Sequence, residues 1–525
     1  SARFLPAILG STMLFFLIPL RKYIGNIGML ICAFFFALSS SFLYYSRFYR
    51  EDIFMSFFTL LLLVCIIKFI ESYFNMNYSN DRNVPRHGGY SFMRFFYIII
   101  GALALASLAA LKENAYIIMA LAFFFLILLF IREKWYVGLM GKIKCRDKKI
   151  LILFAEIIFF IFLFVVFFSL YYTGNFLYIA GMKDAFMKAV LHWYEMHKIE
   201  RMGGPFFFYL PIMVLYELPI FIFGILGIIH YGCCENKKIK ILTYSLIYWI
   251  IVDVLYLISK TYPESSPFLP VSYVSSSIIV FLPLLIYAIL TVLRSKNLFV
   301  AFLTYWAMTN FIVYSYIQEK VPWLVLNPLL PLTMIAAIYL NDIIPDLKLN
   351  SRKGIITLII IIVTSSFFVY SSVEFNFKRY TDPAEPLIQA AQPPQKYALF
   401  LDKMNEISMQ YEGNSTQIQV TDGEMETQFL WYLRHYNNVQ WKVDINSTLD
   451  APLIIVHDGD EDKSEADIVK QNMHTDYERI DSAKMSWYWF KESDITLDYL
   501  LYRKMDRDPS EYRIVLFYKP KFQES

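Results

Sequence analysis

Charged residues stand directly against apolar sequence in this chain of 525 residues. The stretch SRFYREDIFMSFFTLLLL, residues 46–63, opens with Arg47, Arg50, Glu51 and Asp52 and continues almost entirely as hydrocarbon. An arginine offers a bidentate fork to a phosphate, and a carboxylate beside it can hold a metal or act as a general base. These residue types are therefore suited to binding a phosphate-bearing ligand.

Two further segments repeat the combination of a cation with a carboxylate. LKEN contains Lys112 and Glu113, and QEKVPW contains Glu319 and Lys320. A lysine adds a compact point charge for phosphate. The alternative for each cation is ordinary contact with lipid headgroups, because Lys and Arg at the ends of membrane spans commonly extend toward them.

The composition indicates which elements must position these residues. The chain is 57% hydrophobic and 18% aromatic, and its mean hydropathy is +0.45, above what soluble domains show. Twelve stretches are long and apolar enough to span a bilayer: 4–20, 24–42, 53–71, 93–111, 115–131, 150–171, 206–230, 239–258, 269–291, 298–316, 322–340 and 354–373. The sequence therefore predicts a polytopic α-helical membrane protein with about 12 spans.

Loop charge predicts which ends of these spans face outward. Alternate loops hold about 20 Lys and Arg in one set and about 9 in the other, and the cation-rich set is expected to be cytoplasmic. Residues 43–52, 112–114 and 317–321 all belong to the cation-poor set. We therefore expect the three charged segments to lie at the outer face and their side chains to share one cavity at headgroup level.

A longer outer loop offers a possible metal site. HWYEMHKIERMGG, residues 192–204, contains His192, Glu195, His197 and Arg201. Imidazole and carboxylate are zinc ligands, but positions five apart on a helix point about 140° from each other. We therefore expect no certain cofactor and keep a divalent metal as the alternative.

Three carboxylates fall within predicted spans, namely Glu156, Glu217 and Asp253. Ionisable residues at membrane depth are costly and often functional. Glu217 precedes Leu218 and Pro219, where a proline can break a helix. Its other interpretation, as a hydrogen-bonded packing carboxylate, is left open.

From about residue 374 the character of the chain changes. This region has 27 Asp and Glu against 17 Lys and Arg, and no cysteine. Strand-length apolar runs (TQIQVT, VQWKVDI, APLIIVHDG and YRIVLFYK) alternate with helix-like stretches such as KYALFLDKMNEISMQ and EMETQFLWYLRHY. We expect a transmembrane domain over 1–373 and an extracytoplasmic α/β domain over 374–525.

Several of these segments resemble known sequences. SRFYREDIFMSFF resembles the outer-loop motif of the family 39 GT-C glycosyltransferases, the protein O-mannosyltransferases and lipid A aminoarabinose transferases. LKENAYI resembles their Lys-containing turn, and EKVPWLVLNPLLPL resembles a late Lys-x-Pro run of the aminoarabinose transferases. HKIERMGGPFFFYLPIMVLYELP, QEKVPWLVLNPLLPL and TDPAEPLIQAAQPP together resemble an archaeal family of flippase-activity-associated membrane proteins found with N-glycosylation genes.

The resemblance implies a GT-C-like hexosyltransferase of protein glycosylation that uses a polyprenyl-phosphate or dolichol-phosphate sugar donor at the cell membrane. Arg47, Lys112 and Lys320 would bind the donor phosphate, and Asp52 would orient them or hold a metal. Glu113, Glu217, His197 and Arg201 would belong to an acceptor or loop site, without an assigned role for either of the last two.

The resemblance also implies a difference and a rival function. The acidic base of the superfamily lies in a first outer loop, and we expect that span and loop to precede Ser1 here. The rival is an accessory or flippase component for translocating lipid-linked sugars in archaeal N-glycosylation. Either function implies the membrane, the sugar lipid and other glycosylation-pathway proteins as partners, and we expect no nucleic acid.

Overall fold

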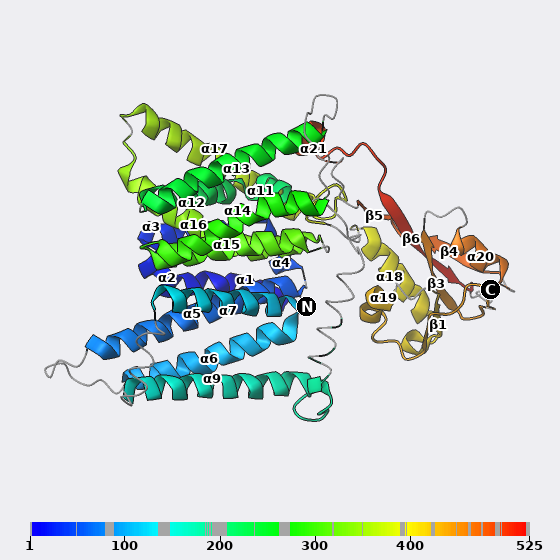
Figure 1. Ribbon diagram of the computed structural model, residues 1–525. Coiled ribbons are helices and arrows are strands. Elements are labelled where there is room, and N and C mark those ends of the chain that lie inside the picture. The colour runs from blue at the N-terminus through cyan, green and yellow to red at the C-terminus, as the bar shows by residue number, and fades with distance from the viewer. Residues whose placement is uncertain are drawn as a thin grey trace. The chain divides into compact units, whose positions relative to one another are not determined.

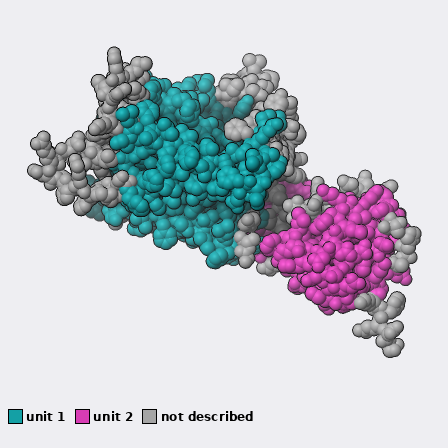
Figure 2. Space-filling view, turned by 90° about the horizontal axis from the view of Figure 1, so that it is seen from below, with its two compact units in different colours: residues 1–378 teal, residues 379–525 magenta. Residues whose placement is uncertain are grey.

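The computed structural model divides the chain into two compact units, Ser1–Lys378 and Arg379–Ser525 (Figures 1 and 2). The expected boundary at 373/374 lies in the π-helical turn η5, Glu374–Lys378, just before this division. The structure describes residues 3–48, 50–78, 89–134, 148–183, 185, 187, 191, 207–235, 237–261, 273–317, 320–348, 350–388, 394, 396–421, 426–447, 449–459, 464–473, 476–488, 494 and 496–520.

The first unit is built from helices that run side by side (Figure 1). They are α1 (Phe4–Thr12), α2 (Leu17–Ile24), α3 (Asn26–Leu38), α4 (Ser40–Arg47), α5 (Glu51–Tyr78), α6 (Gly89–Leu111), α7 (Asn114–Arg132), α9 (Lys148–Tyr172), α11 (Tyr209–Tyr216), α12 (Leu218–Cys234), α13 (Lys237–Thr261), α14 (Tyr273–Arg294), α15 (Leu298–Tyr316), α16 (Leu326–Ile343) and α17 (Arg352–Val373), with the short turns η1 (Met13–Phe16), η3 (Pro322–Val325) and η4 (Ile344–Asp346).

Each of the twelve predicted spans falls on one or more of these helices. Among the described residues, eight helices are long and apolar enough to cross a membrane, or up to ten if each of two bent pairs counts as one span. The remaining two predicted spans, 239–258 and 269–291, correspond to α13 and α14, where many side chains lie outside the described part. The chain is thus a multi-pass membrane protein.

Two of the predicted spans are bent helix pairs. In 24–42, α3 and α4 meet at a 53° bend, and in 206–230, α11 and α12 meet at 112°. Ser39 begins α4 as its N-cap, accepting a hydrogen bond from the Phe42 amide at 3.2 Å. Pro219 lies in the first turn of α12, where its missing amide costs nothing.

Helix α16 is the centre of the first unit and packs against α3, α12 and α15. Glycines on α12 permit this close packing. A Cβ at Gly224 would lie 2.5 Å from Leu332 Cδ1, and one at Gly227 would lie 2.9 Å from Ile335 Cγ2. Small residues allow two helix backbones to approach where lipid supplies no hydrophobic driving force between them.

The second unit is a small α/β fold around a mixed sheet. Its strands are β1 (Ile418–Val420), β2 (Val439–Trp441), β3 (Leu453–Gly459), β4 (Glu478–Asp481), β5 (Met485–Trp487) and β6 (Ser510–Tyr518). The order is β2-β1-β3-β6-β4, with β5 also paired to β6; β1 is parallel to β2 and β3, whereas β6 is antiparallel to β3, β4 and β5.

Side-chain alternation along β3 and β6 gives this sheet two buried faces. Leu453 and Ile455 pack with α18 (Lys396–Met409) and α19 (Glu426–Tyr432) on one face. Ile454 and Val456 pack with α20 (Glu465–Gln471) on the other. Alternate residues of APLIIVHDG therefore face the two sides of the sheet. A short helix, α21 (Leu497–Tyr502), precedes β6.

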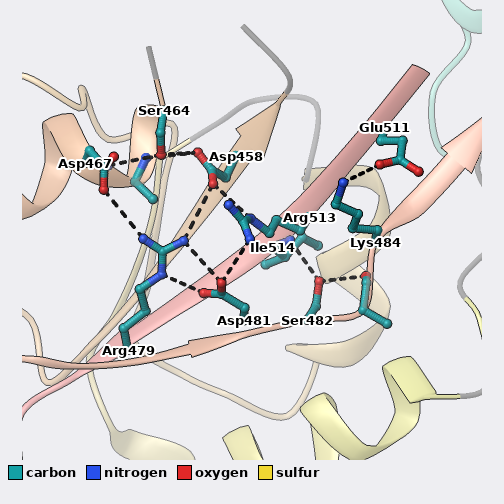
Figure 3. Close-up of polar contacts among 12 residues, drawn as sticks. Asp458, Ser464, Asp467, Arg479, Asp481, Ser482, Lys484, Glu511, Arg513 and Ile514 are labelled. Atoms are coloured by element: carbon teal, nitrogen blue, oxygen red, sulfur yellow. Dashed lines mark hydrogen bonds and ion pairs between the residues drawn. The ribbon is translucent and has the colours of Figure 1, made fainter. Parts of the chain in front are cut away.

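A charged network fastens α20 to the sheet (Figure 3). Asp458 Oδ1 accepts hydrogen bonds from Ser464 Oγ at 2.6 Å and from the Ala466 amide at 3.3 Å, in the first turn of α20. Its Oδ2 accepts one from Arg513 Nε of β6 at 3.1 Å, and Arg479 of β4 lies 3.7 Å away. A carboxylate at a helix N-terminus with cationic partners is favourably placed.

The predicted fold class, helical membrane spans followed by a separate α/β region, is confirmed. The four predicted strand segments contain β1, β2, β3 and most of β6, and the two predicted helical stretches contain α18 and α19. Strands β4 and β5 and helices α20 and α21 were not predicted.

Candidate functional site

Asp52 is the centre of the candidate site. It lies in the first turn of α5, and only 3% of its surface is exposed. Its Oδ1 is 3.0 Å from Lys112 Nζ, and its Oδ2 is 3.2 Å from Arg50 Nε. A carboxylate buried this far needs such partners, because an unpaired buried charge is costly. Asp52 therefore holds two cations in fixed positions.

Lys112 comes from the tight turn between α6 and α7, which explains how it reaches Asp52. The helices end and begin at Leu111 and Asn114, so the turn comprises only Lys112 and Glu113. The Ala115 amide donates to the Lys112 carbonyl at 3.1 Å and closes the turn. Glu113 is half-buried in the same turn.

Trp323 brings a third segment to this site. Its ring, in η3, lies beneath both cations: the guanidinium carbon of Arg50 is 3.1 Å from the ring centroid and Lys112 Nζ is 5.7 Å from it. The face of an indole ring attracts cations. Trp323 is far from Arg50 and Lys112 in the sequence, so folding brings the three together. We call Arg50, Asp52, Lys112 and Trp323 the Asp52 cluster.

Arg47, although close to the Asp52 cluster in sequence, contacts the end of another helix. Its Nη1 donates to the Asn376 carbonyl at 2.8 Å, and its guanidinium carbon is 4.6 Å from the Phe377 ring centroid. Both partners lie in η5, directly after α17. Arg47 therefore connects the 46–52 segment to the end of α17.

Lys320 is almost completely buried, at 1% exposure. Its Nζ donates to the carbonyl oxygens of Ser315 and Ile317, the latter at 2.6 Å, at the end of α15. Lysine side chains favour these positions because the last carbonyls of a helix carry partial negative charge. Burial lowers the pKa of Lys320 from 10.5 to about 8.

The structure therefore brings Asp52 and Lys112 into direct contact and places Arg47 and Lys320 on other partners. That the four side chains face one cavity stays a prediction. Arg50 and Trp323 were not predicted as site residues. Both residues lie within charged segments named above, but only folding brings the Arg50 guanidinium onto the Trp323 ring.

Glu217 lies between the end of α11 and the start of α12 and is fully buried. Its Oε1 accepts hydrogen bonds from Ser39 Oγ at 2.7 Å and from the Ser41 amide at 2.9 Å. Glu156 of α9 instead forms an ion pair with Arg94 of α6. The two carboxylates thus differ in kind, because only Glu156 has a cation among its described partners.

Several other predicted site residues belong to parts of the chain that the structure does not describe. His197 and Arg201, with the rest of the 192–204 metal candidate, lie outside the described residues, and so does the Asp253 side chain. Within the part of the chain that is described, no three His, Cys, Asp or Glu side chains gather as metal ligands would. The Asp52 cluster contains one carboxylate and two cations, which suits an anion better than a metal ion.

Comparisons with known proteins add one weak likeness. No protein-family model and no curated protein matches the chain. Among solved structures, the crystal structure of ArnT from Cupriavidus metallidurans in the apo state aligns with 99% of this chain and 84% of its own, at 12% identity and a TM-score of 0.36. At this similarity no residue role is transferred.

Proposed function

We propose that the chain is a membrane glycosyltransferase of the GT-C type, which takes its sugar from a polyprenyl-phosphate donor at the outer face of the membrane. The observation that carries the proposal is the meeting of three segments in the Asp52 cluster. Those segments, around 47–52, 112–113 and 320–323, are the ones whose sequences resemble GT-C motifs.

The charges of the cluster suit the leaving group of such a reaction. When the bond between the anomeric carbon and the phosphate oxygen breaks, negative charge develops on the polyprenyl phosphate. Two preorganised cations beside that oxygen would stabilise the transition state more than the ground state. Arg50 and Lys112 carry two positive charges against one on Asp52, so the cluster retains a net positive charge for the phosphate.

Asp52 has a positioning role in this proposal. Its two oxygens are each engaged by a cation, Lys112 at 3.0 Å and Arg50 at 3.2 Å. It therefore fixes the spacing of the donors rather than acting as the base that deprotonates the acceptor. Trp323 supports the same geometry, because the Arg50 guanidinium carbon lies 3.1 Å from the centroid of its ring.

A sugar-transfer assay tests this function. Membranes containing the full chain are given a radiolabelled polyprenyl-phosphate sugar and a crude acceptor fraction from the source cells. Lys112→Ala should reduce transfer about 10- to 150-fold, the equivalent of losing a charge-assisted hydrogen bond of about 1.5–3 kcal/mol. Lys22→Ala, which removes an exposed cation of α2, should leave transfer unchanged. Equal rates for the two variants would contradict the proposal.

A role in translocating lipid-linked sugars is the second candidate. The two broken helix pairs favour it, because transporters often build substrate and ion sites from discontinuous helices. A vesicle assay separates the two candidates by following a fluorescent polyprenyl-phosphate sugar from one leaflet to the other. Movement between leaflets without sugar transfer would support the second candidate over the first.

A further inference from the structure

The two broken helix pairs of the first unit touch at their breaks. One break is at Ser39, between α3 and α4, and the other is at Glu217, between α11 and α12. Glu217 Oε1 accepts from Ser39 Oγ at 2.7 Å and from the Ser41 amide at 2.9 Å. One carboxylate thus joins both breaks and meets the positive N-terminal end of α4.

The second oxygen of this carboxylate is unsatisfied. Glu217 is 0% exposed, and its Oε2 has no hydrogen-bond partner among the described residues. The side-chain oxygen of Ser40, also fully buried, is likewise without one within the described ranges. Buried polar atoms in this state each cost free energy, and a charged one costs most.

More unsatisfied oxygens follow at the end of α17. Asn376 Nδ2 donates to the Ser40 carbonyl at 3.4 Å and to the Ser372 carbonyl at 3.0 Å. Asn376 Oδ1 and Ser372 Oγ, each in a residue 1% exposed, have no partner in the described part of the chain. Hydrogen bonds and chain neighbours therefore connect the four residues that carry these unsatisfied oxygens, from Glu217 through Ser40 and Asn376 to Ser372.

The chemistry of these atoms identifies the ligand that would satisfy them. All are oxygens, which suit hard cations, and one carboxylate balances a single positive charge. No Lys or Arg of the described residues forms an ion pair with Glu217, whereas Glu156 has Arg94. A single proton would satisfy Oε2 but would leave most of the hydroxyl and amide oxygens without partners. Discontinuous helices also form the Na⁺ sites of several transporters, where freed oxygens coordinate the ion.

We propose that the breaks at Ser39 and Glu217 form a sodium-ion site. Glu217 Oε2 is its charged ligand, and the oxygens of Ser40, Ser41, Ser372 and Asn376 supply the rest of its shell. The ion ties together α4, α12 and the end of α17, and so fixes the two bends. This site does not depend on the function proposed above.

Thermal unfolding of the full chain in detergent tests the site without any variant. Samples are compared in NaCl, KCl and choline chloride at constant ionic strength and pH. The melting temperature should rise with Na⁺ and saturate, should stay unchanged in choline, and should respond weakly to K⁺. Radioactive ²²Na⁺ should bind to about one site per chain. Identical melting in all three salts would overturn the proposal, as would stabilisation by lower pH alone, which would indicate a proton.

Variants then assign the ion to Glu217. Glu217→Gln keeps the shape of the side chain but removes the charge, and it should abolish both the Na⁺ response and ²²Na⁺ binding. Glu156→Gln is the matched control, since it removes another carboxylate within a helix and should leave the Na⁺ response intact. Ser41→Ala keeps the backbone donor and should weaken Na⁺ binding, which covers the case in which Glu217→Gln does not fold. A full Na⁺ response in folded Glu217→Gln, or in Ser41→Ala if the former does not fold, would refute the assignment.

Discussion

The Trp323 side chain brings the charged segments together, because Arg50 stacks on its ring and Lys112 approaches it. The sequence was sufficient to single out Asp52 and Lys112, since charged residues that directly adjoin apolar sequence are conspicuous. It was not sufficient to assign the partner of Lys320. Whether the Lys320 ammonium faces a ligand or the last carbonyls of the preceding helix α15 depends on where the folded chain places it, which the sequence pattern does not reveal.

Lys320 should make stability depend on pH. Its folded pKa is about 8 against 10.5 for an ordinary lysine, so the unfolded chain binds its proton more tightly. Between these two values the free energy of unfolding should rise with pH, by at most about 1.4 kcal/mol per pH unit from this group. Below pH 8 both states are protonated, and the cost of burying the charge is fully present.

The measurement is the melting temperature of the full chain in detergent from pH 7.5 to 10.5. Lys320→Met removes the titrating group and should flatten the rise with pH relative to the unmodified chain. Lys22→Met removes an exposed lysine and serves as the control with an unaltered slope. Parallel slopes for Lys320→Met and the unmodified chain would show that Lys320 is not buried as described.

The helices and strands differ in how clearly the sequence predicted them. Pro219 marked the break before α12, whereas the break at the N-cap Ser39, before α4, was not predicted because it lies inside one apolar stretch. The strands β3 and β6 were predictable because their side chains alternate between two buried faces. The strand β4 is four residues long with a mostly exposed pattern, so it became a strand through pairing with β6 rather than through its own composition.

Asp458 should make the attachment of α20 sensitive to acid. Burial opposes its ionisation, but hydrogen bonds from Ser464 and Ala466 and the Arg513 guanidinium outweigh burial, and the pKa of Asp458 lies below 3.8. The stabilisation is therefore present above pH 3.8 and is lost as the pH falls through the lower folded value. Asp458→Asn should cost about 1–3 kcal/mol near neutral pH.

Amide hydrogen exchange of the full chain locates this effect. At pH 6, Asp458→Asn should speed exchange in α20 and the end of β3, while exchange in α18 on the opposite face changes little. Asp450→Asn, which alters an exposed carboxyl of the same unit, should leave α20 protected. Unchanged protection of α20 in Asp458→Asn would mean that the network contributes nothing to its attachment.

At the level of the whole chain, the side of the membrane that the second unit occupies decides which way the Asp52 cluster faces. The loop-charge difference predicts that the chain after about residue 374 is extracytoplasmic. Protease added to intact cells should therefore remove the second unit and leave the helices of the first. An untouched second unit in intact cells that is digested after lysis would show the opposite orientation, and the Asp52 cluster would then face the cytoplasm.

Phosphate binding by the Asp52 cluster is tested most directly by measuring binding of polyprenyl phosphate to the purified full chain, with the uncharged polyprenol as the reference ligand. The two lipids differ only in the group that the Asp52 cluster is proposed to hold. The unmodified chain should prefer the phosphate, and Lys112→Ala should lose about 10- to 150-fold in phosphate affinity without change toward the polyprenol. Equal affinity of the unmodified chain for both lipids, or an unaltered preference in Lys112→Ala, would contradict the account.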